Sequence, residues 1–401
     1  MPARVRLFVG KGGAGKSTLA AATALAAARV DKPVLLVSID QAHSLTDVLD
    51  TAPDTGVRAV EDGLDVLEID SLALLEDRFS MLSGLMSLAG AHDHAGPFEL
   101  PAPAELTGLP GIQELLALAE VARLADDGRW HTLIVDAPAS ADAFRTLAAP
   151  RMVADYVERI WPQHRRVEAA TGPDTRLAMV VALFDRVLAS IHGTCELFED
   201  RERITATLVS TPDRAGFAEF RRIRSWLALS GLRLDRVMVN GILPDLAGED
   251  GAAAQWLETC RTAQREVVTR IVAAVDGVPV VECERRAAEP VGLAPLREFG
   301  AVLVGNDSGT RVPSGADPIR VQHESGAGVD AVYAMRMHLP LADPASLTLG
   351  RVDDDLVIGA DGIRRRLRLA SGLRRCTVSA AEFDGSDLIV RFVPDPAVWP
   401  R

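Results

Sequence analysis

The residues best suited to chemistry lie near the start of the chain, in a glycine-rich segment that reads GKGGAGKST over residues 10–18. In the pattern G-x-x-x-x-G-K-[ST], glycines let backbone N–H groups turn onto phosphate oxygens, the lysine reaches the β- and γ-phosphates, and the hydroxyl binds Mg²⁺. An apolar run precedes the segment and an alanine-rich run follows it, which gives the strand, loop and helix that the pattern requires. We therefore expect a site for ATP and Mg²⁺ in which Lys16 is catalytic and Ser17 is a metal ligand. The residues expected around the nucleotide are Gly10, Lys11, Gly12, Gly13, Ala14, Gly15, Lys16, Ser17 and Thr18.

A second candidate is Asp136, which ends the apolar run LIV at residues 133–135. A carboxylate at the end of a buried strand opposite a phosphate loop can hold Mg²⁺, commonly through water. We assign Asp136 to the metal together with Ser17.

The elements that would position these residues follow from the hydrophobic pattern. Short apolar runs alternate with helical stretches, which predicts an α/β fold with a mostly parallel sheet covered by helices on both faces. Two longer insertions, at about residues 71–120 and 152–203, have the apolar spacing of helices, and a Gly-, His- and Pro-rich break is expected at 90–103. The predicted strands are 5–9, 34–38, 64–69, 133–136, 206–210, 236–240 and 278–281.

The pattern changes after residue 304. Residues 305–317 have the composition of a linker, and residues 318–401 show period-two alternation with a hairpin signal, GADG, at 359–362. We therefore divide the chain into a P-loop ATPase domain at 1–304, the linker, and a small all-β sandwich at 318–401. Arg364, Arg366 and Arg368 alternate with apolar residues, and a solvated strand face is a better interpretation of this row than a binding stripe.

Composition excludes several classes of protein. The net charge of −13 disfavours a nucleic-acid partner, which would favour a basic surface. No signal peptide is visible, and the apolar run at 177–184 is stopped by Asp185 and Arg186, so we expect no transmembrane segment. The four cysteines form no CxxC pair, which predicts reduced thiols in a cytoplasmic protein. They are Cys195, Cys260, Cys283 and Cys376.

The segment after the second predicted strand reads SIDQAHSLTD over residues 38–47. It resembles switch I of the ArsA-type (anion-transporting) ATPases, S-T-D-P-A-H-S-L-S-D, and departs from it at Ile39 and at Gln41, where the family has proline. The resemblance implies that Asp40 orients or activates the attacking water, a role that suits phosphoryl transfer. A helix N-cap is the alternative for Asp40. We expect a structural rather than a catalytic role for His43.

Lys11 points to the same family. A lysine directly after the first glycine marks the deviant P-loop class, whose members use it across a dimer interface to touch the partner's nucleotide. The resemblance implies a homodimer in which Lys11 takes part in catalysis. A solvated lysine is the alternative interpretation.

Further motifs extend the resemblance. Residues 136–145, DAPASADAFR, match the family's switch II, D-T-A-P-T-G-x-x-L-R, at the aspartate and arginine but lack its Thr-Gly pair, so hydrolysis could be slow or differently regulated. LPGIQEL at 109–115 is similar to L-P-G-x-D-E-L, and STP at 210–212 is similar to T-T-P-E. Asn240 stands where the family's asparagine reads adenine, and an amide can both donate to and accept from a purine edge.

The resemblance continues to the end of the chain. EPVGL at 289–293 is similar to the family's last loop on the nucleotide side. LPLAD at 339–343 and FVPDPAVW at 392–399 resemble the small heat-shock (α-crystallin-like) domain appended to some bacterial members. The expected protein is thus a single-copy bacterial member with such a domain at its C-terminus.

What the ATPase cycle drives stays open at this point. The metalloid site of the arsenite pump uses cysteine thiolates, and none of these can be mapped onto the four cysteines here, so arsenite pumping in the strict sense is disfavoured. The zinc CxxC of the factor that targets tail-anchored proteins is missing as well. We expect an ATP-hydrolysing homodimer whose cycle drives a conformational change coupled to a client or membrane partner.

The alternative is an ATP-dependent chaperone or carrier of hydrophobic segments without metalloid transport. Methionines near leucine and valine in the insertions, Met81, Met86, Met152 and Met179, favour an adaptable apolar site. An ordinary helix core is the other interpretation of the same residues.

Overall fold

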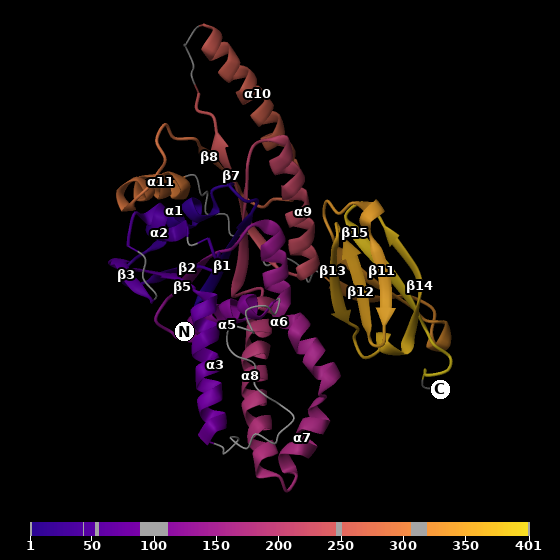
Figure 1. Cartoon of the computed structure of the whole chain (residues 1–401). Helices are drawn as coiled ribbons and strands as arrows, with labels where there is room; N and C mark the ends of the chain where they lie inside the picture. The colour runs from indigo at the N-terminus through magenta and orange to yellow at the C-terminus, as the bar shows by residue number, and fades with distance from the viewer. Residues whose placement is uncertain are drawn as a thin grey trace. The chain divides into compact units, whose positions relative to one another are not determined.

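The computed structural model describes residues 2–42, 44–52, 56–88, 111–245, 251–305 and 319–399, with the side chains of 79, 81–88, 176, 304 and 305 left aside. The chain forms two compact units, Met1–Ile204 with Ala288–Val304 and Thr205–Ala287 with Gly305–Arg401, and each is described by itself (Figure 1). His43, the predicted break, residues 109–110 and all but the first residue of the predicted linker lie outside the described residues, as do the side chains of Met81 and Met86.

The first unit is built on five strands in the order β3-β4-β2-β5-β1. The strands β4, β2, β5 and β1 are parallel, whereas β3 runs antiparallel to β4 at the edge. Every residue of β2 is buried, which explains its continuous apolar sequence. The predicted parallel α/β fold is confirmed; β3, with its four largely half-exposed residues, was not predicted. The strands are β1 Arg4–Gly10, β2 Val34–Ser38, β3 Arg58–Glu61, β4 Leu64–Glu68 and β5 Thr132–Asp136.

Helices α1 (Lys16–Ala27), α2 (Ser44–Leu49) and α11 (Leu293–Gly305) accompany this sheet. Because half of the residues of α1 are alanine, other elements can approach its backbone closely. A Cβ at Gly300 of α11 would lie 2.3 Å from the carbonyl oxygen of Ala22, so only glycine allows α11 to pack there.

A group of longer helices overlaps the ranges where insertions were predicted, although α5 extends beyond the first range and α6 begins before the second. The helix α8 packs against α5, α6 and α7, and α3 packs against α5. Arg166 of α7 is buried and links three of these helices: its Nε donates to Asp185 of α8 at 2.9 Å and its Nη1 donates to Glu158 of α6 at 3.2 Å. The helices are α3 Ser71–Leu88, α5 Ile112–Asp126, α6 Ser140–Ile160, α7 Gln163–Thr171 and α8 Thr175–Glu199.

The helix α8 continues through Asp185 and Arg186, where the apolar run was predicted to stop. Among the described residues, Leu177–Glu199 is the one helical stretch that is long and apolar enough to cross a membrane. Core helices of soluble proteins meet the same criterion, so this finding by itself carries little weight.

The second unit contains three parallel strands in the order β6-β7-β8, with helices α9 and α10. Asp213 caps α9 by accepting the N–H of Gly216 at 2.8 Å. A Cβ on Gly216 would lie 2.3 Å from the carbonyl oxygen of Thr211, so glycine is required for this tight entry into the helix. The bounds are β6 Ile204–Ser210, α9 Arg214–Ser230, β7 Arg233–Ile242, α10 Ala252–Ala273 and β8 Val280–Glu284.

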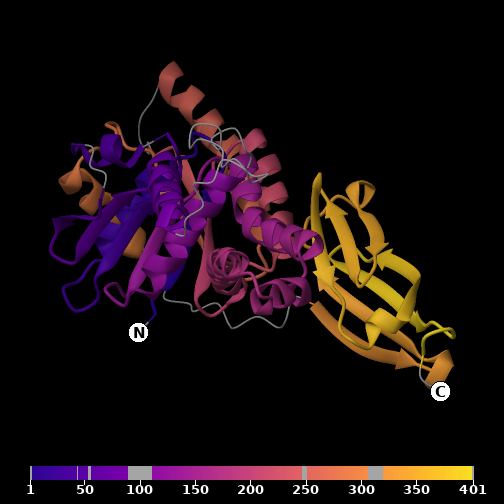
Figure 2. The same ribbon diagram turned by 60° about the horizontal axis from the view of Figure 1, so that its bottom comes forward.

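The end of the chain is an antiparallel β sandwich, as predicted. One sheet has the order β14-β15-β10-β9 and the other β11-β12-β13. The strands of this part of the chain are drawn in orange and yellow in Figure 2. The predicted hairpin joins β12 and β13, and Asp361 (φ 51°) and Gly362 (φ 82°) both adopt the left-handed conformation of a two-residue turn. The strands are β9 Ile319–Ser325, β10 Val332–His338, β11 Thr348–Val352, β12 Asp355–Ala360, β13 Ile363–Arg368, β14 Cys376–Phe383 and β15 Asp387–Pro394.

The arginine row lies on β13. Arg364 and Arg368 are exposed, and Arg366 donates to Asp355 of the neighbouring strand at 2.5 Å. This arrangement agrees with a solvated strand face.

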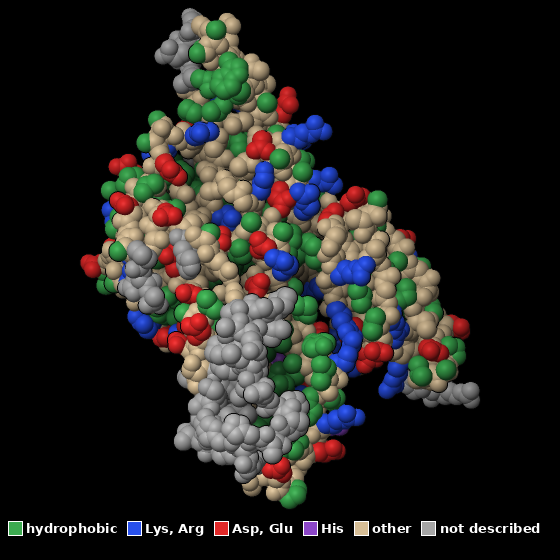
Figure 3. Space-filling model, in the orientation of Figure 1, with side chains coloured by type: hydrophobic (Ala, Val, Ile, Leu, Met, Phe, Trp, Pro, Cys, Tyr) green, Lys and Arg blue, Asp and Glu red, His purple; other side chains and the backbone are tan. Residues whose placement is uncertain are grey.

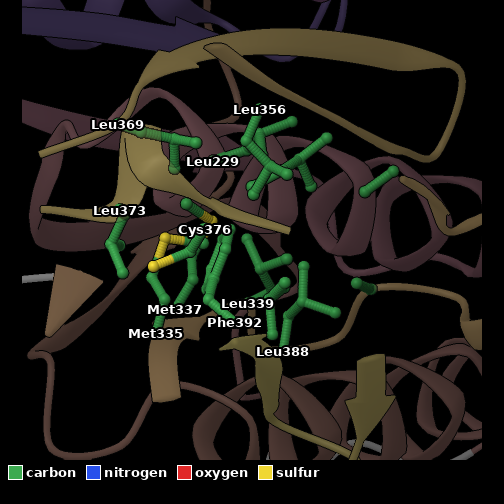
Figure 4. Packing of buried hydrophobic residues seen from close by; sticks show 14 residues of the cluster. Leu229, Met335, Met337, Leu339, Leu356, Leu369, Leu373, Cys376, Leu388 and Phe392 are labelled. Atoms are coloured by element: carbon green, nitrogen blue, oxygen red, sulfur yellow. The ribbon is translucent and has the colours of Figure 1, made fainter. Parts of the chain in front are cut away.

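The core of the sandwich includes one residue from outside it, Leu229 in the last turn of α9 (Figure 4). Leu229 is 1% exposed and belongs to the same buried cluster as Met335 and Phe392. Polar contacts surround this insertion: Arg365 of β13 donates to the Leu229 carbonyl, and Arg221 of α9 donates to that of Leu341 at 3.4 Å. The α9 helix is therefore part of the hydrophobic core of the β sandwich.

We expect Leu229→Ala to destabilise the β sandwich by about 2–5 kcal/mol, because truncating a buried leucine loses its transfer free energy and leaves a cavity. Calorimetry of the full chain should show a lower unfolding midpoint. Val352→Ala, at a position of the same sandwich that is 43% exposed, is the control. Equal midpoints for the two variants would show that Leu229 does not contribute to this core.

Candidate nucleotide site

The loop between β1 and α1 has the geometry of a phosphate cradle. Gly13 (φ 75°) and Gly15 (φ 88°) both adopt left-handed conformations that favour glycine. Lys16 begins α1 and is 7% exposed, so its ammonium group lies within the site, whereas Lys11 is exposed. The first turn of α1 thus presents backbone N–H groups and a buried cation to whatever occupies the loop.

Strand order brings this loop to Asp136. The central strand β5 lies between β1 and β2, with Asp136 in register with Phe8 on one side and Ser38 on the other. The carboxyl ends of the three strands therefore meet at one edge of the sheet, where ligands of parallel α/β sheets bind. The backbone N–H of Ile39 donates to the Asp136 carbonyl at 3.1 Å, which places Asp40 one residue beyond this contact.

The carboxylate of Asp136 is the most perturbed acid in this arrangement. Burial raises its pKa to about 7, the Ser17 hydroxyl and the Lys16 charge lower it, and the charges of Asp40 and Glu68 raise it further. Both carboxylate oxygens are buried and neither accepts a hydrogen bond of normal geometry, although the Ser17 hydroxyl is near enough to act on the pKa. Such a group is costly to keep ionised without a partner.

These residues fit a magnesium ion. Mg²⁺ prefers oxygen ligands and retains several waters, and it would remove the cost of the unpaired carboxylate. The Ser17 hydroxyl, the other expected ligand, lies 2.8 Å from the Ser44 hydroxyl at the start of α2. Ser44 was not predicted as a site residue, although it lies within the switch I motif.

Asp40 lies in a turn before α2 and does not cap that helix. Its Oδ1 accepts the N–H of Ala42 at 3.1 Å, and its own N–H donates to the Ser38 hydroxyl at 3.2 Å. The alternative interpretation as an N-cap is therefore wrong for α2.

Glu68, at the end of β4, occupies the start of α2 instead. Its Oε1 accepts from the N–H groups of Leu45 and Thr46 at 2.8 and 3.2 Å. Glu68 was not predicted as a site residue, because its only signal in the sequence was its position at the end of a buried strand. It supplies the negative charge that a helix N-terminus favours.

The switch II segment follows β5 directly. Ser140 begins α6, and a Cβ added at Gly12 would lie 3.6 Å from the Cβ of Ala139, an ordinary contact between the phosphate loop and this segment. Arg145, which the family motif retains, forms an ion pair with Asp142.

Asn240 belongs to the second unit, so its expected contact with adenine stays a prediction. It lies near the carboxyl end of β7, in register with Cys283 of β8, and a register shift follows at Gly241 (φ 86°). Gln264 of α10 holds this bend, because its amide donates to the Gly241 carbonyl at 3.1 Å and accepts the N–H of Leu243 at 2.9 Å. A bulge of this kind sets the direction of the neighbouring side chain.

Comparison with known proteins agrees with the geometry. The sequence profile described as "Anion-transporting ATPase" matches residues 3–305, which is most of the chain. The chain belongs to the anion-transporting ATPase family. A second profile, "HSP20-like domain found in ArsA", matches residues 330–392 of the β sandwich. Both parts of the predicted family resemblance are thereby confirmed.

Three relatives that are similar over most of this chain have different names. Protein Rv2184c of Mycobacterium tuberculosis is 43% identical, with 99% of this chain and 98% of the relative covered. A putative arsenical pump-driving ATPase of Aquifex aeolicus is 24% identical, with 96% and 99% covered. The ATPase get3 of Neurospora crassa is 26% identical, with 74% and 90% covered.

We expect Asp136→Asn to stabilise the ligand-free ATPase by on the order of 1–3 kcal/mol at pH 8, because the amide removes a buried, unpaired charge. The folded-state pKa of Asp136 is raised above its unfolded value, so the wild-type protein loses stability as the pH rises from about 4 to about 7. The advantage of the variant should therefore be absent near pH 4 and complete above pH 7. Urea unfolding at several pH values measures it.

The same variant should lose the extra stability that Mg²⁺ with ATP gives to the wild type. A variant that is no more stable than the wild type at pH 8 would contradict the unpaired, ionised carboxylate.

Proposed function

We propose that this chain is a Mg²⁺-dependent ATPase that works as a homodimer and couples its nucleotide cycle to a conformational change. The observation that carries the proposal is the meeting of the phosphate loop, Asp136 and the Asp40 segment at one edge of the sheet. Family membership supports ATPase activity, and we assign the residue roles from the geometry of the site.

In this assignment, backbone N–H groups of residues 12–18 and the Lys16 ammonium group hold the phosphates. Ser17 and Asp136 hold the metal, which when bound neutralises phosphate charge. Asp40 orients the attacking water: the N–H of Ala42 fixes one carboxylate oxygen, and the other accepts from the water. Asn240 reads the adenine edge.

Lys11 acts on the partner's nucleotide. The chain carries a single phosphate loop, and the exposed Lys11 side chain can reach across an interface, as a cation supplied in trans does in other phosphoryl-transfer enzymes. The changed switch II segment, without the Thr-Gly pair, supports a hydrolysis rate that is slow or differently regulated.

We expect Asp40→Asn and Lys11→Ala to separate two roles. Asp40→Asn should lower ATP hydrolysis at least ~100-fold while leaving ATP binding and the ATP-bound dimer intact, because only the orientation of water is lost. Lys11→Ala should lower hydrolysis and also shift the ATP-bound protein toward monomer. Phosphate release and light scattering with ATP and Mg²⁺ provide the two measurements.

Unchanged hydrolysis in Asp40→Asn would remove Asp40 from its role. A wild-type protein that stays monomeric with ATP and Mg²⁺ would remove the homodimer. Lys32→Ala, at an exposed lysine of the loop before β2, is the control for charge loss.

A second candidate function, the carrying of hydrophobic segments, rests on exposed apolar residues of the long helices. Met152, Tyr156 and Ile160 of α6 are spaced by four residues and are 60–65% exposed, so they form a stripe along one side of the helix. Figure 3 shows hydrophobic side chains on the surface of the helical group. The helices α7 and α8 add Val167, Leu177, Met179, Val180 and Val187.

Contiguous exposed apolar surface usually marks an interaction site, and flexible methionines suit varied partners. The names of the relatives do not decide between a carrier and a pump-driving ATPase. One relative is named ATPase get3, and another is named a putative arsenical pump-driving ATPase.

The cysteines favour the carrier. Cys195, Cys283 and Cys376 are buried, and burial raises the pKa of Cys195 to about 11 and that of Cys283 to about 12. Metalloid binding needs thiolates, so these groups are poorly suited to it.

The proposal also includes a cytoplasmic location and three parts of the chain: the ATPase domain at 1–304, the linker at 305–317 and the β domain at 318–401.

We expect an apolar helical peptide to crosslink to α6 and α8 more strongly in one nucleotide state than in the other. Tyr156→Asp, which places a charge in the stripe, should reduce the crosslink at least ~5-fold, because burying an unpaired charge is unfavourable. Val30→Asp, at an exposed valine outside these helices, is the matched control. A crosslink that is independent of nucleotide, or equally strong in both variants, would argue against the carrier.

A further inference from the structure

Gln41 is the residue of switch I that departs from the family pattern, and its amide has specific partners. Its Nε2 donates to Gln113 Oε1 at 2.9 Å and to the Ser71 hydroxyl at 3.1 Å. The Ser71 hydroxyl in turn donates to Gln113 Oε1 at 3.4 Å. The three side chains therefore form a closed set of hydrogen bonds, here called the amide triad.

The amide triad joins three separate elements. Gln41 follows Asp40, Ser71 is the first residue of α3, and Gln113 is the second residue of α5. Ser71 is 6% exposed, so its hydroxyl is held within the protein rather than exchanged with water. A displacement of the Asp40 segment would act directly on the first turns of α3 and α5.

Both glutamines replace other residues of the family pattern. The family has proline at position 41 and aspartate at position 113, in LPGIQEL against L-P-G-x-D-E-L. Proline has no side-chain donor, so the family pattern cannot make this bond. The two departures thus lie against each other as donor and acceptor.

The helices reached by the triad pack against the rest of the helical group. The helix α3 contacts α5, and α5 contacts both α6 and α8, which carry the exposed apolar residues. Among the described residues, Asp40 forms its hydrogen bonds with Ser38 and Ala42 rather than with these helices, so Gln41 is the neighbour that makes the connection.

We propose that Gln41 is a positioning residue: through Gln113 and Ser71 it fixes the Asp40 segment against α3 and α5 and transmits nucleotide binding to these helices. This inference rests on the proposed ATPase function and on the role of Asp40. It adds a residue and a route of coupling that the family pattern lacks.

The test compares the full-length wild type with Gln41→Ala, Gln113→Ala and the double variant. Hydrogen exchange of residues 71–75 and 112–117 is measured with and without ATP and Mg²⁺, and steady-state hydrolysis gives kcat and KM. We expect each single variant to lose at least half of the ATP-induced change in exchange and to lower kcat about 5-fold, within the range of typical coupling effects, with KM for ATP within about 2-fold. The double variant should be no worse than either single variant, because all three remove the same interaction.

A rescue variant separates this role from a structural one. Gln113→Glu keeps an oxygen that accepts from the Gln41 amide, so it should retain the wild-type exchange response, unlike Gln113→Ala. Gln163→Ala, at an exposed glutamine that begins α7, controls for loss of a glutamine in the helical group.

The outcomes distinguish the two proposals. A wild type that binds but does not hydrolyse ATP would overturn the proposed function and leave the exchange measurement in place. If the wild type hydrolyses ATP but Gln41→Ala shows the full exchange response and an unchanged kcat, only the proposed role of Gln41 is overturned. Additive losses in the double variant would also overturn it.

Discussion

The position of the Asp136 carboxylate is the constraint on which the rest of the site depends. Because β5 lies between β1 and β2, Asp136 is enclosed by the two strands that lead into the phosphate loop and into switch I. Neither oxygen is paired, and burial raises its pKa to about 7. A fold that keeps an acid in this condition gives up stability that a bound cation can restore.

Switch I is tied to this centre by groups of different strength. The Glu68 carboxylate holds the first N–H groups of α2 by charge-assisted hydrogen bonds, and Ser44 contacts Ser17 through a hydroxyl pair. The amide triad, by contrast, consists of neutral hydrogen bonds at a largely exposed glutamine. The fixed end of switch I is therefore the start of α2, and its weaker attachment lies at Gln41, next to Asp40.

The parallel sheet, the phosphate loop and the β sandwich could be predicted from the sequence, because each depends on local periodicity or on glycine spacing. Buried strands such as β2 and β5 are continuous apolar runs, and the turn at Asp361 and Gly362 has its own dipeptide signal. The edge strand β3 was missed, because a strand that is exposed on much of its surface loses the apolar pattern. The edge strands β9, β11 and β14 of the sandwich are exposed in the same way. The expected contacts of Lys11 and Asn240 depend on a partner chain and a ligand, and they remain predictions.

The residues that sequence reasoning did not find share one property: their role depends on contacts between distant parts of the chain. Glu68 meets α2 across 23 positions, and Gln41 meets Gln113 across 72. Leu229 is apolar and helical in its own sequence context, yet it completes the core of a sandwich that begins about 90 residues later. Nothing local marks it, since a buried leucine in an amphipathic helix ordinarily packs against its own domain. The last turn of α9 therefore contributes directly to the packing of the sandwich.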